Sequence, residues 1–415
     1  MATPTIRRWP QLLTGSLVFL CVGLIYAWSI FAGLLKASFP SWSAKDLAAT
    51  FTLIMAFFCL GNFCAGFLAG RMTLRARLLL SAVLTGLGYL GAALVQEHSL
   101  WLLYLSYGVL GSFGVGLAYN AVLSTVTRWF PDRIGAASGT LMMSFACSTL
   151  VLGVGAEALS RGLGWRPVMA GIALLTAAAL AVGACILRLP EPGAPLPGKA
   201  AAGPRRPSGG RSCTPLEMVA SLPFWLFFVW GIFLLVAVYG LMGNVKQCAL
   251  ELDPSAKAVA TAAVTLLAIA NGLGRLLLGS LYDRFGRIRT MTLDTLLIIA
   301  SSGAMVLAFR TRSLALMLLG VALTGLAYGG VPPTSSAFVV DFFGAEDYPM
   351  KFGVVNLFIF VGAFGSALAG MIKDTAGSFE KLFYLLIVLG LLALGLNLMI
   401  RKPAPSAGLQ EEAAS

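Results

Sequence analysis

Long apolar runs alternate with short polar segments along almost the whole chain. Twelve of these runs are long enough to cross the ~30 Å hydrocarbon core of a bilayer as helices. They cover residues 12–36, 47–70, 76–95, 99–127, 133–158, 166–188, 222–248, 257–281, 288–309, 313–340, 350–372 and 379–400. Because unpaired backbone groups are not tolerated in lipid, the runs predict an all-α polytopic membrane protein with 12 transmembrane helices.

A segment rich in Pro, Gly and Ala separates the sixth run from the seventh. Such a composition is typical of a solvated linker. We therefore divide the chain into an N-terminal six-helix half (1–189), a cytoplasmic linker (190–220), a C-terminal six-helix half (221–402) and a cytoplasmic tail (403–415).

The two halves also repeat one another in sequence. The segment 66–71 after the second run is echoed by 279–284 after the eighth, and Gly-Leu-Ala-Tyr ends at Tyr119 in the fourth run and at Tyr328 in the tenth. A duplicated six-helix unit is typical of transporters whose substrate site lies near the membrane midplane, where the halves meet.

Composition supports the same class of protein. The chain of 415 residues is 58% hydrophobic and 11% charged, with a mean hydropathy of +0.88, which excludes an ordinary soluble globule. Its net charge of +12 comes from basic residues scattered among short loops, so we expect a lipid bilayer as partner and no nucleic acid. One histidine and seven cysteines without ligand spacing predict no metal site.

The basic residues also predict an orientation. With the N-terminus inside, inner segments hold eighteen Lys and Arg residues and outer segments hold ten, which leaves Arg275 within a span. By the positive-inside rule both termini face the cytoplasm, and we expect a multi-pass protein of the cell (inner or plasma) membrane.

Arg275 is the only full charge between Ala258 and Leu281. A cation near the middle of a bilayer costs ~3 kcal/mol on insertion scales, so some interaction must offset it. Helical side chains lean toward the N-terminus, so Arg275 reaches back over Asn271 on the same face. The pattern predicts an anion site; a structural arginine bound to carbonyl oxygens or a buried carboxylate is the alternative.

The loop after the eighth run carries a recognisable motif, Gly279-x-Leu281-x-Asp283-Arg284-x-Gly286-Arg287. It resembles the signature loop of the major facilitator superfamily; in the first half Arg71 matches while Gly70 replaces the acid. Gly286 permits a tight turn, and Asp283 and the arginines can latch to neighbouring helix ends. The resemblance implies that such a latch stabilises the outward-facing form.

Three segments are similar to a narrower group, the oxalate/formate antiporter family, which neighbours the monocarboxylate transporters. They are 23–31 in the first run, 128–139 before the fifth, and Asn-Gly-x-Gly-Arg at 271–275, the last being similar to both groups. In these families the arginine binds the carboxylate, which implies that role for Arg275.

Two departures from these families bear on the charge of the substrate and on proton coupling. Oxalate exchangers use a second cation in the eleventh span, but the expected position falls near Ile359, which favours a substrate with one negative charge. Animal-type monocarboxylate carriers pair their arginine with an aspartate and a lysine, where this chain has Asn271 and approximately Ile30. Proton coupling by that route is therefore not expected, and the proton carrier stays open.

Aromatic side chains complete the predicted cavity. A pseudo-twofold relation would bring Tyr119 and Tyr328 toward the centre, where their hydroxyls bond a carboxylate; amphipathic packing is an equal alternative. Tyr26 and Trp28 in the first run either wall the cavity or form a packing stripe.

Several polar and charged residues near the ends of the runs are expected to contact water, substrate or one another. Asn244 and Lys246 end the seventh run on the outer side, where Lys246 guides anions inward or snorkels. Two acids, Glu157 and Asp294, are expected near span ends in contact with water. Loop salt bridges are expected for four further residues, namely Asp132, Arg133, Asp341 and Lys351.

These observations predict a secondary active transporter of small monocarboxylates (lactate, pyruvate, formate or acetate type), working by alternating access as a proton symporter or an anion exchanger. No hydrolase or ATP-binding motif is present, so we expect no catalytic residue, no enzyme activity and no cofactor. The partners are a small organic anion, with a proton in the symport alternative, and we expect a monomer. Oxalate:formate antiport, an anion channel and a membrane sensor are the alternatives.

Overall fold

A computed structural model describes residues 4–191, 196 and 213–401. The regular structure of these residues is entirely helical, as predicted. Most of the predicted linker and all of the predicted tail 403–415 lie outside the described residues. The end of the linker forms a short helix, whose first turn is closed by a capping box between Thr214 and Glu217.

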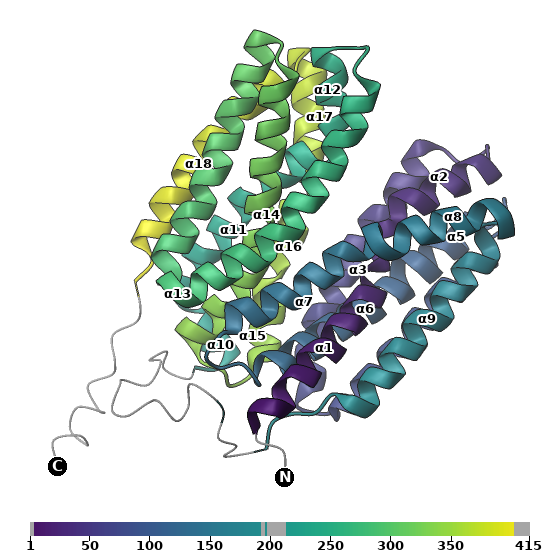
Figure 1. The fold of residues 1–415 in the computed structure, drawn as a ribbon, viewed down its shortest axis with the longest axis vertical. Coiled ribbons are helices and arrows are strands. Elements are labelled where there is room, and N and C mark those ends of the chain that lie inside the picture. The colour runs from purple at the N-terminus through teal and green to yellow at the C-terminus, as the bar shows by residue number, and fades with distance from the viewer. Residues whose placement is uncertain (1–3, 192–195, 197–212, 402–415) are drawn as a thin grey trace.

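The N-terminal half is a bundle of helices that lie roughly side by side (Figure 1). Its helices are α1 (Pro4–Val22), α2 (Trp28–Ser38), α3 (Ala44–Ala69), α4 (Leu74–Ala93), α5 (Leu100–Leu103), α6 (Ser112–Thr127), α7 (Ile134–Ser148), α8 (Val154–Leu163) and α9 (Trp165–Ile186). A 3-10 turn at Gly23–Ala27 and π-helical turns at Tyr104–Gly111 and Thr149–Gly153 join some of them into longer rods.

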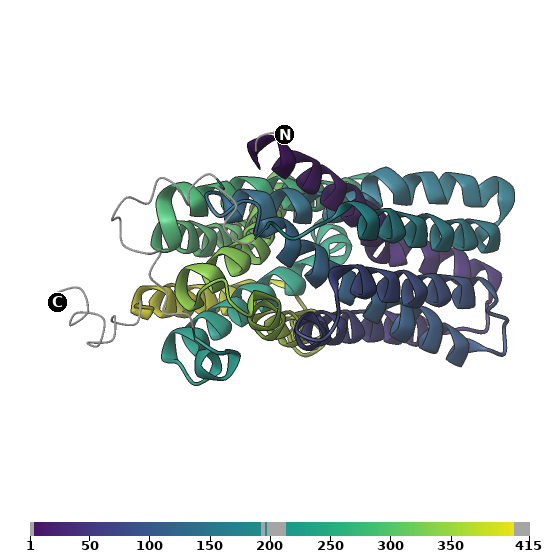
Figure 2. The same ribbon diagram turned by 90° about the horizontal axis from the view of Figure 1, so that it is seen from below.

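The C-terminal half is a second bundle beside the first (Figure 2). Its helices are α10 (Pro215–Val219), α11 (Leu222–Met242), α12 (Val245–Leu252), α13 (Lys257–Thr311), α14 (Leu314–Phe343), α15 (Tyr348–Val355), α16 (Leu357–Gly362), α17 (Gly365–Ala376) and α18 (Glu380–Met399).

Eleven helices in the described part of the chain are long and apolar enough to cross a membrane. One of them, the 55-residue α13, contains two of the twelve predicted spans, because its backbone breaks at Gly286 with φ +76° and ψ 179°. We call residues 257–285 its first limb and 287–311 its second limb. The seventh predicted span ends earlier than expected, since α11 stops at Met242 and α12 is a separate helix.

The two bundles converge at the end of the molecule where α1 begins and α18 ends, and they diverge toward the opposite end (Figure 1). Between the halves, α7 packs against α13 and α14, and α3 packs against α15 and α16. At the α7–α13 crossing, a Cβ atom on Gly135 would overlap the carbonyl oxygen of Gly279, and the reverse also holds. Only glycines permit backbones to meet this closely, so the glycine pair sets how the halves touch.

Candidate functional site at the junction of the two halves

Arg275 lies in the first limb of α13 and is 2% exposed. Its Nε donates a hydrogen bond to Asn271 Oδ1 at 3.3 Å, as the backward lean of a helical side chain predicts. Its Nη1 donates to the backbone carbonyl of Met142 in α7, at 2.6 Å. No ion pair of the described residues includes Arg275, so neutral oxygens alone hold a full positive charge.

A small cavity lies beside Arg275, and residues of both halves line it. Its volume is about 20 Å³, which accommodates roughly one water molecule. The lining residues are Phe58, Tyr119, Phe145, Leu235, Arg275, Tyr328, Val331, Pro332, Phe358 and Ile359. Arg275 is the only charged residue among them, and the two tyrosines contribute the only hydroxyl groups of the lining.

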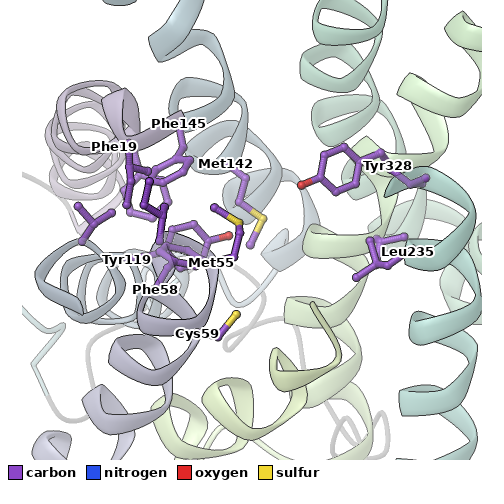
Figure 3. Packing of buried hydrophobic residues seen from close by; sticks show 14 of the residues in the cluster. Phe19, Met55, Phe58, Cys59, Tyr119, Met142, Phe145, Leu235 and Tyr328 are labelled. Atoms are coloured by element: carbon purple, nitrogen blue, oxygen red, sulfur yellow. The ribbon is translucent and has the colours of Figure 1, made fainter. Parts of the chain in front are cut away.

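The structure brings Tyr119 and Tyr328 into this cavity from opposite halves, as the internal repeat predicts. Their hydroxyls point toward one another across the junction in Figure 3. The guanidinium of Arg275 lies 5.8 Å from the centre of the Tyr328 ring, within the range of a cation–π interaction. Two hydroxyls and one guanidinium therefore converge on one point between the halves.

Two further groups at this site escaped the sequence analysis. Tyr239 in α11 shares a hydrogen bond of 3.0 Å with the hydroxyl of Tyr328. It carries the only hydroxyl in an otherwise apolar helix, which was the available signal. The sequence cannot identify the Met142 carbonyl as a partner of Arg275, because every residue carries a backbone acceptor.

Other predicted site residues lie away from this cluster. Trp28 is buried in the N-terminal half, where its ring lies 5.3 Å from that of Tyr107. Asn244 donates to the carbonyl of Gly240 at 2.9 Å, and Lys246 is exposed on α12. The side chain of Tyr26 lies outside the described residues. Trp28 thus packs within the N-terminal half, and neither Asn244 nor Lys246 lines the cavity.

The signature loop joins the two halves through Asp283. Its carboxylate accepts hydrogen bonds from the backbone N–H groups of Gly135, at 2.8 Å, and Ala136, at 2.7 Å. These N–H groups belong to the first turn of α7 and have no partner within the helix. The positive end of the α7 dipole adds to the attraction. Asp283 therefore contacts a neighbouring helix end, as expected, and its role as a gating latch stays a prediction.

The arginines of the loop act differently from one another. Arg287 is buried and donates to the carbonyls of Asn397, at 3.0 Å, and Ile400, at 2.9 Å, at the end of α18. This contact stays within the C-terminal half, so Arg287 does not latch one half to the other. Arg284 and Arg71 are both exposed.

The structure corrects two expectations about charged residues. Asp294 does not meet water at a span end: it is 0% exposed, because the bend at Gly286 carries the second limb back into the bundle. Lys351 is not a loop salt-bridge partner, since it is buried and donates to the carbonyls of Phe343, at 2.7 Å, and Glu346, at 2.6 Å, where α14 ends.

The other expected loop residues do form polar contacts. Asp132 pairs with Arg133 at 3.6 Å and with Arg8 at 3.0 Å. Asp341 accepts a hydrogen bond from the hydroxyl of Tyr282 at 3.4 Å.

Known proteins share both sequence and fold with this chain. A family model described as Major Facilitator Superfamily matches residues 16–309 and, in a second match, 242–414. The chain also resembles the solved structure of the proton:xylose symporter XylE, with a TM-score of 0.73, 16% identity and coverage of 96% of this chain and 97% of that one. At this identity the likeness concerns the fold alone.

Three known proteins have sequences related to that of this chain. "Uncharacterized MFS-type transporter YhjX" of Escherichia coli (strain K12) is 28% identical over 364 residues, 86% of each chain. The oxalate:formate antiporter of Oxalobacter formigenes is 25% identical over 386 residues, 88% of this chain and 85% of the relative. Monocarboxylate transporter 11 of Homo sapiens is 29% identical over 153 residues, 37% of this chain and 32% of the relative.

Proposed function

The chain belongs to the Major Facilitator Superfamily, and from this premise we propose that it carries small monocarboxylates, of the lactate, pyruvate, formate or acetate type, by alternating access. One observation carries the proposal: a buried arginine without a carboxylate partner among the described residues lines a cavity between the two halves. A bound anion would supply the missing negative charge. Family relatives with carboxylate substrates in their names support this choice.

Substrate binding exchanges one partner of Arg275 for another. The Arg275 Nη1 now donates to the Met142 carbonyl in α7, which is a bond between the halves. A substrate carboxylate takes over this donor and forms a stronger, charge-assisted hydrogen bond. Hydroxyls of Tyr119 and Tyr328 reach the same carboxylate from opposite halves. The ligand therefore replaces a protein contact between the halves and biases them toward a different arrangement.

The cavity lining favours a single negative charge. Ile359, near the position where the resemblance to oxalate exchangers leads us to expect a second cation, lines the cavity as an apolar side chain. A dianion would leave one carboxylate without a cation, and a close charge pair is worth about 4 kcal/mol at an effective dielectric constant of 20. We therefore place monocarboxylates ahead of oxalate.

Oxalate:formate exchange is the second candidate. It is favoured by the 25% identity to the antiporter of Oxalobacter formigenes, which extends over 88% of this chain. The two candidates differ in whether oxalate occupies the site.

Counterflow of labelled lactate, pyruvate, formate and oxalate into proteoliposomes tests the proposal. We expect exchange of the monocarboxylates without competition from oxalate. The substitution Arg275→Gln should reduce the rate of monocarboxylate counterflow by at least about tenfold, because a hydrogen bond to a charged group contributes about 1.5–3 kcal/mol. The matched control Arg310→Gln removes an exposed arginine of the same helix and should retain exchange. Equal exchange by Arg275→Gln would contradict the proposal, and competition by oxalate would select the second candidate.

The same sequence pattern leads us to propose that both termini are cytoplasmic, with eighteen basic residues on the inner side against ten on the outer side. In this orientation the halves meet on the cytoplasmic side, which corresponds to an outward-facing arrangement. The cluster is complete within one chain, so we propose that a monomer transports.

A further inference from the structure

The second limb of α13 holds an acid that the substrate site does not use. Asp294 is 0% exposed, and neither Oδ1 nor Oδ2 has a hydrogen-bond partner among the described residues. An ionised carboxylate in such surroundings would lose its hydration without compensation. Ionisable residues inside membrane helices are candidates for proton relays. The buried position thus favours the neutral, protonated form of Asp294.

Charged groups on the surrounding helices lie elsewhere. The α11 helix, which donates a hydrogen bond to the neighbouring Thr295, has no charged residue. Helix α14 contributes only Asp341, which contacts Tyr282. The charged residues of α18 are at its far start, and Arg287 of the same limb is bound to the end of α18. In the first limb, Arg275 donates to Asn271 and to the carbonyl of Met142 and forms no hydrogen bond or ion pair with Asp294. A proton is therefore the cation that can neutralise this carboxylate.

A short piece of α14 connects Asp294 with the substrate site. A Cβ atom on Gly330 would lie 2.8 Å from Asp294 Oδ2 and 2.9 Å from Oδ1. The adjacent Gly329 faces the first limb, where its Cβ would lie 2.6 Å from the backbone nitrogen of Arg275. Gly329 thus packs against the first limb of α13 at Arg275, and Gly330 packs against the second limb at Asp294.

The same piece of α14 also lines the cavity. Tyr328 and Pro332 are lining residues on either side of the glycine pair. Pro332 and Pro333 lack the N–H groups that would bond the carbonyls of Tyr328 and Gly329, so the helix is weakened here. A ligand that moves Tyr328 will also move the backbone against which Asp294 packs.

We propose that Asp294 is the proton-binding site that couples proton movement to transport of the anion, an inference that rests on the proposed function. In the described arrangement its carboxyl group carries the proton, bound to one oxygen. Release converts the acid to a carboxylate and a free proton, and no other bond changes. One proton then crosses with each monocarboxylate bound at Arg275, so transport is electroneutral and follows the pH gradient rather than the membrane potential.

Proteoliposomes separate coupling from substrate binding. Counterflow at equal pH measures substrate exchange alone, and uptake under an imposed pH gradient, with the potential clamped, measures coupling. For one proton per anion, a gradient of one pH unit supports accumulation up to about tenfold. The wild type should perform both reactions. Asp294→Asn, which mimics the protonated acid permanently, should retain counterflow but lose accumulation, so that the internal and external concentrations become equal.

The matched control is Glu157→Gln, a partly exposed acid that pairs with Arg161, and it should behave as the wild type. Accumulation by Asp294→Asn equal to the wild type would overturn the inference, as would a wild type that exchanges substrate but ignores the pH gradient. Absence of counterflow in the wild type would instead refute the proposed function, and the inference with it.

A second measurement decides the matter if Asp294→Asn fails to fold. Dicyclohexylcarbodiimide reacts with protonated carboxyl groups in apolar surroundings, and mass spectrometry locates the adduct. Modification of Asp294 in the wild-type protein that declines as pH rises supports the inference. An unreactive Asp294 at every pH contradicts it.

Discussion

Among the described residues, Arg275 donates only to an amide oxygen and a backbone carbonyl, although its guanidinium carries a full positive charge. Neutral acceptors hold an arginine in place without cancelling its charge, whereas a carboxylate partner would do both. The residue is therefore positioned in advance and still electrostatically unsatisfied. That combination suits a site whose ligand brings the negative charge and leaves again.

The number of cations in the cavity should set the number of negative charges on the substrate. We expect Ile359→Lys to admit oxalate, because the new ammonium adds a second cation to a lining that has one. Inhibition of monocarboxylate counterflow by oxalate measures the change. Ile359→Met alters the shape of the lining without charge and should leave oxalate excluded. If Ile359→Lys exchanges monocarboxylates but still ignores oxalate, charge counting does not determine selectivity here.

Sequence reasoning located much of this cluster but not all of it. The contact between Arg275 and Asn271 follows from helix geometry, and the internal repeat places Tyr119 and Tyr328 together. Their roles in binding remain predictions. Asp294 was misplaced because its burial depends on how the second limb packs against α14 at Gly330, which no local sequence pattern encodes. The Met142 carbonyl depends on how α7 crosses α13, which no local pattern encodes.

At the scale of elements, the crossing of α7 and α13 joins the halves at the end where α1 begins. The Gly135 and Gly279 pair lets the two backbones touch, and Asp283 places a negative charge on the first turn of α7. Both features act only while the halves are close on this side. Under the proposed alternating access, the crossing is a contact that has to break.

Asp283→Asn should weaken this contact. The substitution keeps the size of the side chain but removes the charge at the helix N-terminus, which is worth about 1 kcal/mol and would change the ratio of the two arrangements about fivefold. Distances between spin labels at Arg128 and Arg289, in a background without reactive cysteines, should show a larger population with the halves apart on this side. Asp253→Asn, an acid outside the crossing, serves as control. An unchanged distance distribution would show that Asp283 is not a latch.

The spans themselves were largely predictable from apolar run length, and the φ of +76° at Gly286 confirms the predicted turn. The interruptions within spans were not. The 3-10 turn at Gly23–Ala27, for example, lies where Gly23 packs against the backbone of Phe145 in α7. Such interruptions depend on contacts with neighbouring helices, so an apolar run alone does not predict them.

At the scale of the whole molecule, two bundles meet near the start of α1 and the end of α18 and diverge at the opposite end (Figure 1). The duplicated sequence predicts two halves, and the exact residues at which one half ends and the other begins remain a prediction. Which end faces the cytoplasm is a proposal that rests on the distribution of basic residues.

Fusion reporters test that orientation. A fluorescent protein that matures only in the cytoplasm, fused behind Ser415, should fluoresce, because the proposed topology places this end inside. The same reporter inserted after Asp253, between α12 and α13, should stay dark. The opposite pattern would invert the topology and make the described arrangement inward-facing.

The pairing of Arg275 with a substrate carboxylate is the central claim, and a double-mutant cycle on binding tests it most directly. Calorimetry would compare lactate with its neutral amide, lactamide, on the wild-type protein and on Arg275→Gln. The account predicts that the wild type prefers lactate by at least about tenfold, roughly 1.4 kcal/mol, and that Arg275→Gln loses this preference. Undiminished preference for lactate in Arg275→Gln would show that another group binds the carboxylate.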